Sequence, residues 1–284
     1  MSEDLNIVGA AERVPRGRRC RWWVGAGLAV VVIAVAAVIL ASGGGGGGGP
    51  LNAIAKAAEV TQREPGGHAT INMKVESAAT SEGITATGPT TFDDSGRAEA
   101  TITVKGLTTG KELTITTIGI GRRSYTTSPV PGAIPEGKKW LEIDVPSAPT
   151  KAGAPPANGP KEGLKVLEGV EEAEKVGEED IDGVSTTHYR GTFPRAAEVF
   201  GVKVDISEPE IDAWIDAQER VRQMQVSLKS AVSGVEDSAA TTDMTIDYES
   251  FGRVPKIEAP PAGEVFNGTS ELESKLQSAA GEEG

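Results

Sequence analysis

Apolar and polar residues alternate along several short segments of the chain, which is the pattern of strands with one buried and one solvated face. The segment 68–77 alternates strictly, and segments 98–104, 113–120 and 241–251 repeat the pattern. Asp93-Asp94-Ser95-Gly96 indicates a hairpin turn between a Thr-rich strand over 84–92 and the segment 98–104. The sequence therefore predicts a series of antiparallel strands.

Segments with helical spacing interrupt this series. Residues 51–63 place apolar side chains on one helical face, and residues 161–176 carry an apolar stripe. A short helix is also expected over 193–200, and the proline-rich stretch 129–160 is expected to be mostly irregular. The order is a helix, about five strands, a loop, a helix and about five more strands. This order predicts an α+β fold in which a curved antiparallel sheet carries helices on its concave face.

The N-terminal region has a different pattern. Residues 22–41 form a run of 20 without a charge, rich in Val, Ala and Ile. About 20 apolar residues suffice for a helix to cross the hydrocarbon layer. Five arginines precede the run, and Trp22 and Trp23 begin it. This arrangement predicts a single-pass helix in the cell membrane, with a cytoplasmic N-terminus and an extracytoplasmic C-terminal domain.

A cleaved signal peptide is the alternative reading of the same run, because small residues follow it at Ala41-Ser42. The run is longer than the roughly 7–15 apolar residues of a signal peptide, which favours an uncleaved anchor. Lipid attachment through a signal would need a Cys directly after the run. The only Cys, Cys20, precedes it. Seven glycines, Gly43 to Gly49, then indicate a flexible tether.

Several segments in the second part of the chain resemble a known family. They are Lys139–Asp144, the helix with Leu164 and Leu167, Glu178–Arg190, Ile211–Asp216, Arg220–Met224, Thr242–Tyr248, Phe251-Gly252 and Ile257–Phe266. In order and spacing they are similar to the LppX/LprG family of envelope lipoproteins, within the LolA-like half-barrel superfamily. The resemblance implies a half-barrel of about ten strands whose cavity holds the acyl chains of lipids or glycolipids.

The pattern and the resemblance together predict five regions. They are a cytoplasmic Arg-rich tail (1–21), a transmembrane helix (22–41), a Gly-rich tether (42–50), a LolA/LppX-like extracytoplasmic domain (51–266) and a disordered or weakly helical tail (267–284).

Composition excludes several classes of function. The formal net charge is −13, which is unfavourable for binding nucleic acid through its phosphates. One Cys and two His, His68 and His188, leave little for a zinc site. No nucleophile, metalloprotease or phosphate-loop motif occurs, so we expect no enzyme, no cofactor and no metal. His188 is expected to be a polar strand residue, and Asp212 and Asp216 to be solvated.

The predicted function is that of a membrane-tethered protein that binds lipid or glycolipid acyl chains, and the resemblance implies a role in envelope lipid transport. The alternatives are an extracytoplasmic sensor or regulatory domain, or a structural envelope domain without a ligand, in which the same residues form a filled core. Inward-facing apolar positions of the strands are the candidate cavity lining: Ile71, Met73, Val75, Ile102, Val104, Leu113, Ile115, Met224, Val226, Leu228, Met244 and Ile246.

Overall fold

The computed structural model describes residues 49–77, 83–108, 111–127, 134–144, 159–193, 196–199, 202–232, 238–270 and 274. The predicted Arg-rich tail, the membrane helix and nearly all of the tether lie outside these residues, as does most of the predicted C-terminal tail. In the part that the structure does describe, none of the helices has the length and apolar character needed to span a membrane.

In the part of the chain that the structure describes, a helix of substantial length precedes the sheet. Helix α2 spans Pro50–Gln62, and its proline lies in the first turn, where the missing N–H costs no hydrogen bond. Ile54, Ala57, Ala58 and Thr61 are its buried residues. These positions share one helical face, so α2 packs by a single small-residue stripe.

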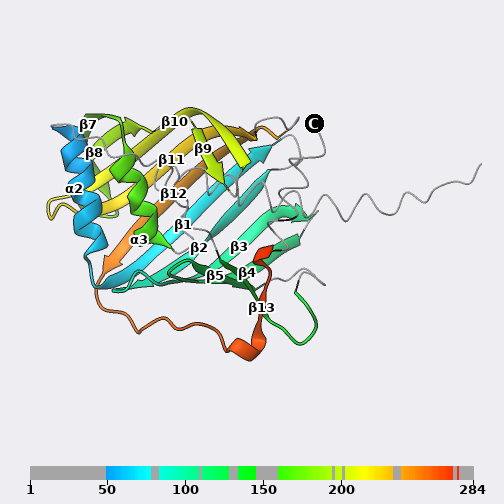
Figure 1. The fold of residues 1–284 in the computed structure, drawn as a ribbon. Coiled ribbons are helices and arrows are strands. Elements are labelled where there is room, and N and C mark those ends of the chain that lie inside the picture. The colour runs from blue at the N-terminus through cyan, green and yellow to red at the C-terminus, as the bar shows by residue number, and fades with distance from the viewer. Residues whose placement is uncertain are drawn as a thin grey trace, which may run out of the picture.

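Within the described residues, thirteen strands form one sheet (Figure 1). The strands of the first part are β1 (Gly66–Ser77), β2 (Ile84–Asp93), β3 (Ala98–Thr108), β4 (Lys111–Ile120), β5 (Arg123–Thr127) and β6 (Trp140–Asp144). Those of the second part are β7 (Glu172–Ile181), β8 (Val184–Thr192), β9 (Ala196–Val199), β10 (Val202–Asp216), β11 (Val221–Val232), β12 (Ala240–Phe251) and β13 (Val265–Asn267).

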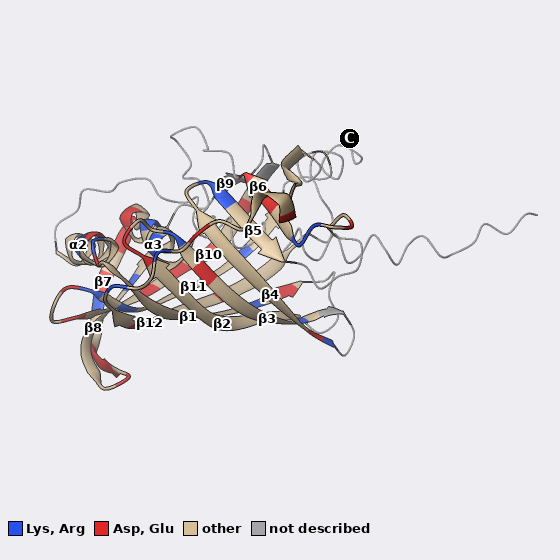
Figure 2. Cartoon of the chain, turned by 90° about the horizontal axis from the view of Figure 1, so that it is seen from below, with Lys and Arg blue, Asp and Glu red and all other residues tan. Residues whose placement is uncertain are grey.

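The two parts of the sheet join at β1 and β12. The strand order is β13-β6-β5-β4-β3-β2-β1-β12-β11-β10-β8-β7, and β9 pairs with β10. All pairings are antiparallel except that of β13 with β6, which is parallel. Figure 2 shows the sheet bent into a trough, with β5 and β6 curling over one side and α2 and α3 lying over the other. The expected antiparallel sheet is confirmed, but the fold is mostly β and has more than the predicted ten or so strands.

The expected helix over 161–176 is wrong in its extent. The structure has a short helix α3 (Pro160–Gly163), a 3₁₀ helix η2 (Leu164–Gly169), and then β7 from Glu172. The apolar residues Leu164, Leu167 and Val170 recur every third residue, and all three are buried. A 3₁₀ helix has three residues per turn, so this spacing belongs to η2 rather than to an α-helix.

The short helix expected over 193–200 is wrong where the structure describes this stretch. Ala196–Val199 is strand β9, which pairs with the beginning of β10. Strand β10 is also longer than expected, because it begins at Val202 rather than near Ile211.

Helices α2, α3 and η2 pack on the concave face of the sheet. Ile54 and Leu167 belong to the same buried cluster as Met224, Ile246 and Tyr248. A Cβ built on Gly163 would lie 3.4 Å from Cδ1 of Ile246, so α3 rests directly on β12. The Tyr248 hydroxyl donates to the Pro160 carbonyl at 2.7 Å and fixes the start of α3. The main core therefore lies between the helices and one end of the strands.

A C-terminal segment packs against the outward side of β4 and β5. It includes the 3₁₀ helix η3 (Ala262–Glu264) and leads from β12 to β13. Asp93 Oδ2 accepts from the Ile257 amide at 3.2 Å, and Arg97 Nη1 donates to the Ile257 carbonyl at 2.9 Å. Ile257 packs with Ile118 and Tyr125 in a small separate cluster. These contacts hold the segment against the turn between β2 and β3.

Candidate ligand-binding face

The register of the sheet brings the predicted cavity residues onto one face. Leu113, Val104, Ala86, Met73, Met244 and Val226 stand directly opposite one another in a row from β4 to β11. A second row contains Ile71, Ile246 and Met224, and a third contains Val75, Thr242 and Leu228. Ile102 stands opposite Ile115. Directly opposed residues share a face, so all twelve predicted positions lie on the concave side.

Part of this face is packed under the helices. Met224 and Val226 are 0 % exposed, and Leu228, Met244 and Ile246 are buried with them in the cluster that includes α2 and η2. Such complete burial is that of an ordinary protein interior. Here the filled-core alternative describes the residues correctly.

A second part of the face has a different environment. Val75, Ile84, Ala86, Val104 and Ala240 form a buried cluster, with Met73, Ile102 and Ile115 packed against it. Every member lies on a strand, and among the described residues no helix contributes to this cluster, which we call the strand-only cluster. Met73, Ile102 and Ile115 are only half-buried, as are Ile71 and Leu113. Apolar side chains that point into the trough thus retain accessible surface away from the helices.

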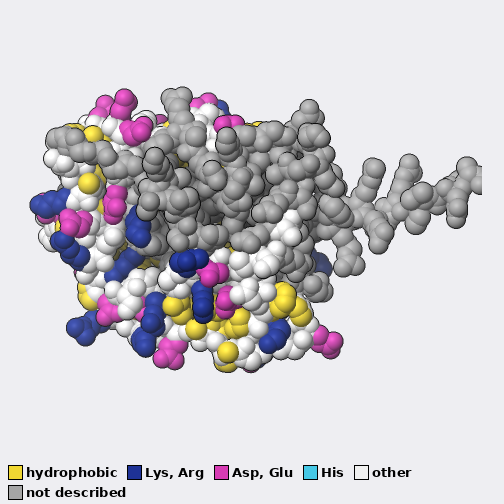
Figure 3. Space-filling view, in the orientation of Figure 1, with side chains coloured by type: hydrophobic (Ala, Val, Ile, Leu, Met, Phe, Trp, Pro, Cys, Tyr) yellow, Lys and Arg dark blue, Asp and Glu magenta, His cyan; other side chains and the backbone are white. Residues whose placement is uncertain are grey.

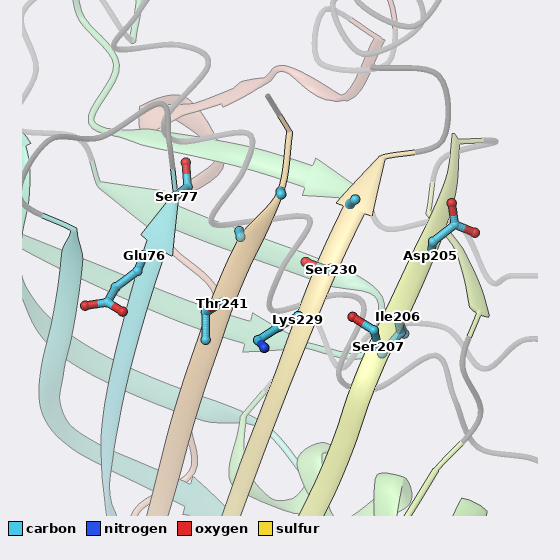
Figure 4. A pocket seen from close by; sticks show the side chains of 11 residues that line it. Glu76, Ser77, Asp205, Ile206, Ser207, Lys229, Ser230 and Thr241 are labelled. Carbon is cyan, nitrogen blue, oxygen red and sulfur yellow. The ribbon is translucent and has the colours of Figure 1, made fainter. Parts of the chain in front are cut away.

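The strand-only cluster leads to a hollow at the ends of four strands. This rim hollow has a volume of about 580 Å³. Figure 4 shows its lining on the neighbouring ends of β1, β12, β11 and β10. The lining residues are Glu76, Ser77, Asp205, Ile206, Ser207, Lys229, Ser230, Ala231, Ala239, Ala240 and Thr241. Ala240 belongs to both the rim hollow and the strand-only cluster, so the two are continuous.

A polar cluster that the sequence did not predict lies on the opposite, convex face. His188 on β8 is 4 % exposed, and its Nε2 lies 2.6 Å from Asp212 Oδ1 on β10. Its Nδ1 lies 2.9 Å from Glu179 Oε1 on β7. The expectation that Asp212 is solvated is therefore wrong, and Asp216 is also buried, where it accepts from Arg220 Nε at 3.0 Å.

Trp214 completes this convex cluster. Its ring stacks on His188 with centroids 4.3 Å apart, and its Nε1 donates to Glu179 Oε2 at 2.8 Å. These hydrogen bonds, first that of Trp214 and then that of His188, lower the pKa of Glu179. Arg190 Nε donates to Asp212 Oδ1 at 2.9 Å. The cluster ties β7, β8 and β10 together. The sequence analysis did not find it, because its signal is that four residues share the outward side of adjacent strands: Glu179, His188, Asp212 and Trp214.

The described surface that is visible in Figure 3 has no large patch formed by Lys and Arg alone. Lys and Arg side chains are interspersed with Asp and Glu along its visible margins. In Figure 2 acidic residues are prominent at β7 and β8. No group of three or more His, Cys, Asp or Glu in the described part of the chain is placed to hold a metal ion.

Comparison with known proteins identifies the family. The model of the LppX_LprAFG lipoprotein family matches residues 50–247. The chain belongs to this family. The LppX_LprAFG match runs from α2 to Asp247 in β12 and includes all twelve predicted cavity positions. It confirms the resemblance found in the sequence. Cys20, the only cysteine, lies outside the matched residues.

The solved structures that match this member of the LppX_LprAFG family in structure share little sequence with it. The lipoprotein LppX of Mycobacterium tuberculosis is 13 % identical with a TM-score of 0.41, and the match covers 73 % of this chain and 97 % of LppX. LprF of Mycobacterium bovis is 14 % identical with a TM-score of 0.40, over 76 % of this chain and 100 % of LprF. A LolA superfamily protein of Nitrosomonas europaea is 9 % identical with a TM-score of 0.29, over 75 % of this chain and 96 % of that protein. No curated protein matches the chain.

Proposed function

We propose that this protein binds lipids or glycolipids by holding their acyl chains on the concave face of the sheet, and that it does so as a non-catalytic carrier or holder in the cell envelope. The observation that supports the proposal is the half-buried state of Met73, Ile102 and Ile115, which point into the trough beside the strand-only cluster. Apolar side chains of a filled domain core would be packed to the density of an organic crystal. Accessible apolar surface inside a trough is what an acyl chain needs.

The energetics favour chains over small polar ligands at this face. Each buried methylene contributes about 0.8 kcal/mol. A chain that lies along the rows from β1 to β4 therefore gains affinity with each added carbon, without needing a specific polar contact. In this proposal the site comprises Ile71, Met73, Val75, Ile102, Val104, Leu113 and Ile115, whereas Met224, Val226, Leu228, Met244 and Ile246 form the packed floor beneath the helices.

The membrane anchor remains part of the proposal. Residues 22–41 would hold the protein at the membrane, and the glycine tether would let the domain reorient there. A tethered holder acts near its own membrane, so the proposed role is to receive or present lipids at that surface.

Native mass spectrometry of the full-length chain, followed by lipid extraction, tests the proposal. We expect mass additions that disappear on extraction and that yield acyl lipids. If the protein purified from cells with intact envelope lipids carries no added mass, the carrier function is rejected and a structural or sensor domain is favoured.

A further inference from the structure

The rim hollow has a lining whose chemistry differs from that of the strand-only cluster. Its inward row consists of Ser77, Ala240, Ser230 and Ile206, which stand opposite one another across β1, β12, β11 and β10. Its outward row consists of Glu76, Thr241, Lys229 and Ser207. Figure 4 shows both rows at the strand ends. Hydroxyl groups and methyl groups thus alternate around a volume of about 580 Å³, within the size range of small-molecule sites.

The charged residues at this rim are engaged with one another. Lys229 Nζ lies 2.7 Å from Glu208 Oε1, and Lys74 Nζ lies 2.7 Å from Glu76 Oε1. Lys229 is the one basic residue of the described lining, and Asp205 adds a further carboxylate. An anionic group in the hollow would approach these carboxylates without gaining a lysine that is free to pair with it. The local charge therefore disfavours phosphate and carboxylate headgroups.

The position of Ala240 indicates in which direction a bound lipid would point along the trough. This residue is 5 % exposed and packs with Val75, Ile84, Ala86 and Val104, yet it also lines the rim hollow. An acyl chain on the strand-only cluster would therefore leave its polar end beside the two inward hydroxyl-bearing residues, Ser77 and Ser230. Ester oxygens accept hydrogen bonds from hydroxyl groups, and sugar hydroxyls both donate and accept them, so either group can pair with the inward serines.

We infer that the rim hollow is a headgroup subsite that selects lipids with an uncharged, hydroxyl-bearing headgroup over anionic lipids with the same chain. The inference rests on the proposed function, since it assigns the polar end of the same ligand. Glycerol esters and sugar esters share this chemistry, and the experiment separates them.

The test compares three ligands with one C16 chain: monopalmitoylglycerol, palmitoyl sucrose and palmitoyl lysophosphatidic acid. The full-length chain is held in a fluorinated surfactant, which mixes poorly with hydrocarbon, and each ligand displaces the apolar dye N-phenyl-1-naphthylamine. We expect the two neutral ligands to displace the dye at concentrations at least about fivefold lower than the anionic one. The tighter of the two neutral ligands identifies the source of the headgroup.

Variants locate the effect. The double variant Ser77→Ala/Ser230→Ala removes the two inward hydroxyls and should weaken the neutral ligands roughly threefold to tenfold, as expected for one or two lost hydrogen bonds. Thr245→Val is the control, because Thr245 lies on the outward face of β12, away from the rim, and stands opposite Gln225. Glu76→Gln/Asp205→Asn should improve the anionic ligand about twofold to fivefold per charge removed.

The outcomes separate the subsite from the carrier function. If no ligand displaces the dye from the unmodified protein, the proposed function fails. If all three displace it equally and the rim variants behave like Thr245→Val, acyl binding stands and the headgroup subsite is overturned.

Discussion

Nε2 of His188 and Oδ1 of Asp212 lie 2.6 Å apart and join β8 to β10 across the convex face. Both side chains are less than a tenth exposed, and Asp212 also accepts from Arg190. The contact is central because Glu179 of the edge strand β7 reaches the other nitrogen of the same ring. One imidazole therefore connects the last three strands of the sheet.

Removing Asp212 should destabilise this region strongly. Asp212→Ala leaves a buried imidazole and a half-exposed guanidinium without their shared acceptor, and we expect the free energy of unfolding to fall by about 3 kcal/mol. Asp243→Ala is the control, because its half-buried carboxylate accepts only from Ser227 Oγ at 2.7 Å among the contacts described, and it should cost about 1 kcal/mol. Urea denaturation measures both. Equal losses would show that the convex cluster adds nothing to stability.

Acid should loosen the hairpin of β7 and β8. Because the Glu179 pKa is lowered by Trp214 and His188, the folded state binds this proton less readily than the unfolded state. Its contribution to stability is therefore complete above the ordinary pKa of 4.5 and is lost as the pH falls through the lowered value. Hydrogen exchange of the hairpin amides between about pH 6 and pH 3 should accelerate more in the unmodified protein than in Glu179→Gln. Identical pH profiles would contradict the assignment.

The packed and open parts of the concave face should respond differently to one added ring system. Met224→Trp overpacks a fully buried position next to Gly163 and should cost about 1–3 kcal/mol. Ile102→Trp extends into accessible space, so we expect a change within about 0.5 kcal/mol together with a loss of bound lipid. Melting curves and lipid extraction on the same two variants check this. Comparable destabilisation at both positions would favour a filled trough.

Two buried threonines offer a matched pair for hydrogen bonding. Thr61 Oγ1 accepts from the Val221 amide at 2.8 Å and donates to the Ala57 carbonyl at 2.7 Å. Within the described part of the chain, the Thr242 hydroxyl is buried without a hydrogen-bond partner. Thr61→Val should cost about 1–3 kcal/mol, because the Val221 amide is left unsatisfied, whereas Thr242→Val should be neutral or stabilising. A costly Thr242→Val change would reveal a partner for that hydroxyl.

The predicted anchor can be tested independently of the fold. Arginines before an apolar run of 20 residues place the N-terminus in the cytoplasm. A reporter that is active only outside the cytoplasm, fused after Gly284, should be active, and a cytoplasmic reporter at the same point should be silent. The opposite pair of results would overturn the topology.

Period-two alternation was sufficient to place Met73, Val104 and Met244 on one face, because a strand residue has only two faces to choose from. Alternation does not say which strands are neighbours, so the pairing of β1 with β12 could not be read from it. It also does not separate packed from accessible positions. Met224 is fully buried and Ile102 is not, and the difference depends on where α3 and η2 lie.

The convex cluster shows a second limit. Asp212 occupies an outward position and was expected to be solvated, as outward carboxylates usually are. Its burial arises from Trp214, His188 and the edge strand, which the local sequence does not reveal. The three-residue spacing of Leu164, Leu167 and Val170 is present in the sequence. It fits a drifting α-helical stripe as well as the three-residue period of a 3₁₀ helix, and only the second interpretation is correct.

The junction of β1 and β12 has a consequence for how the protein reaches its native state. The Thr70 hydroxyl donates to Glu249 at 2.5 Å although 179 residues separate them in the sequence. β1 must therefore remain an open edge until nearly all of the domain has been synthesised, because its partner is the last long strand. Such non-local pairing is typical of sheets that fold slowly, in milliseconds to seconds, and that expose unpaired edges while they do so. One edge of β1 pairs early with β2, but until β12 arrives the other edge can pair with another chain. Correct assembly of this trough therefore depends on how long that edge stays unpaired.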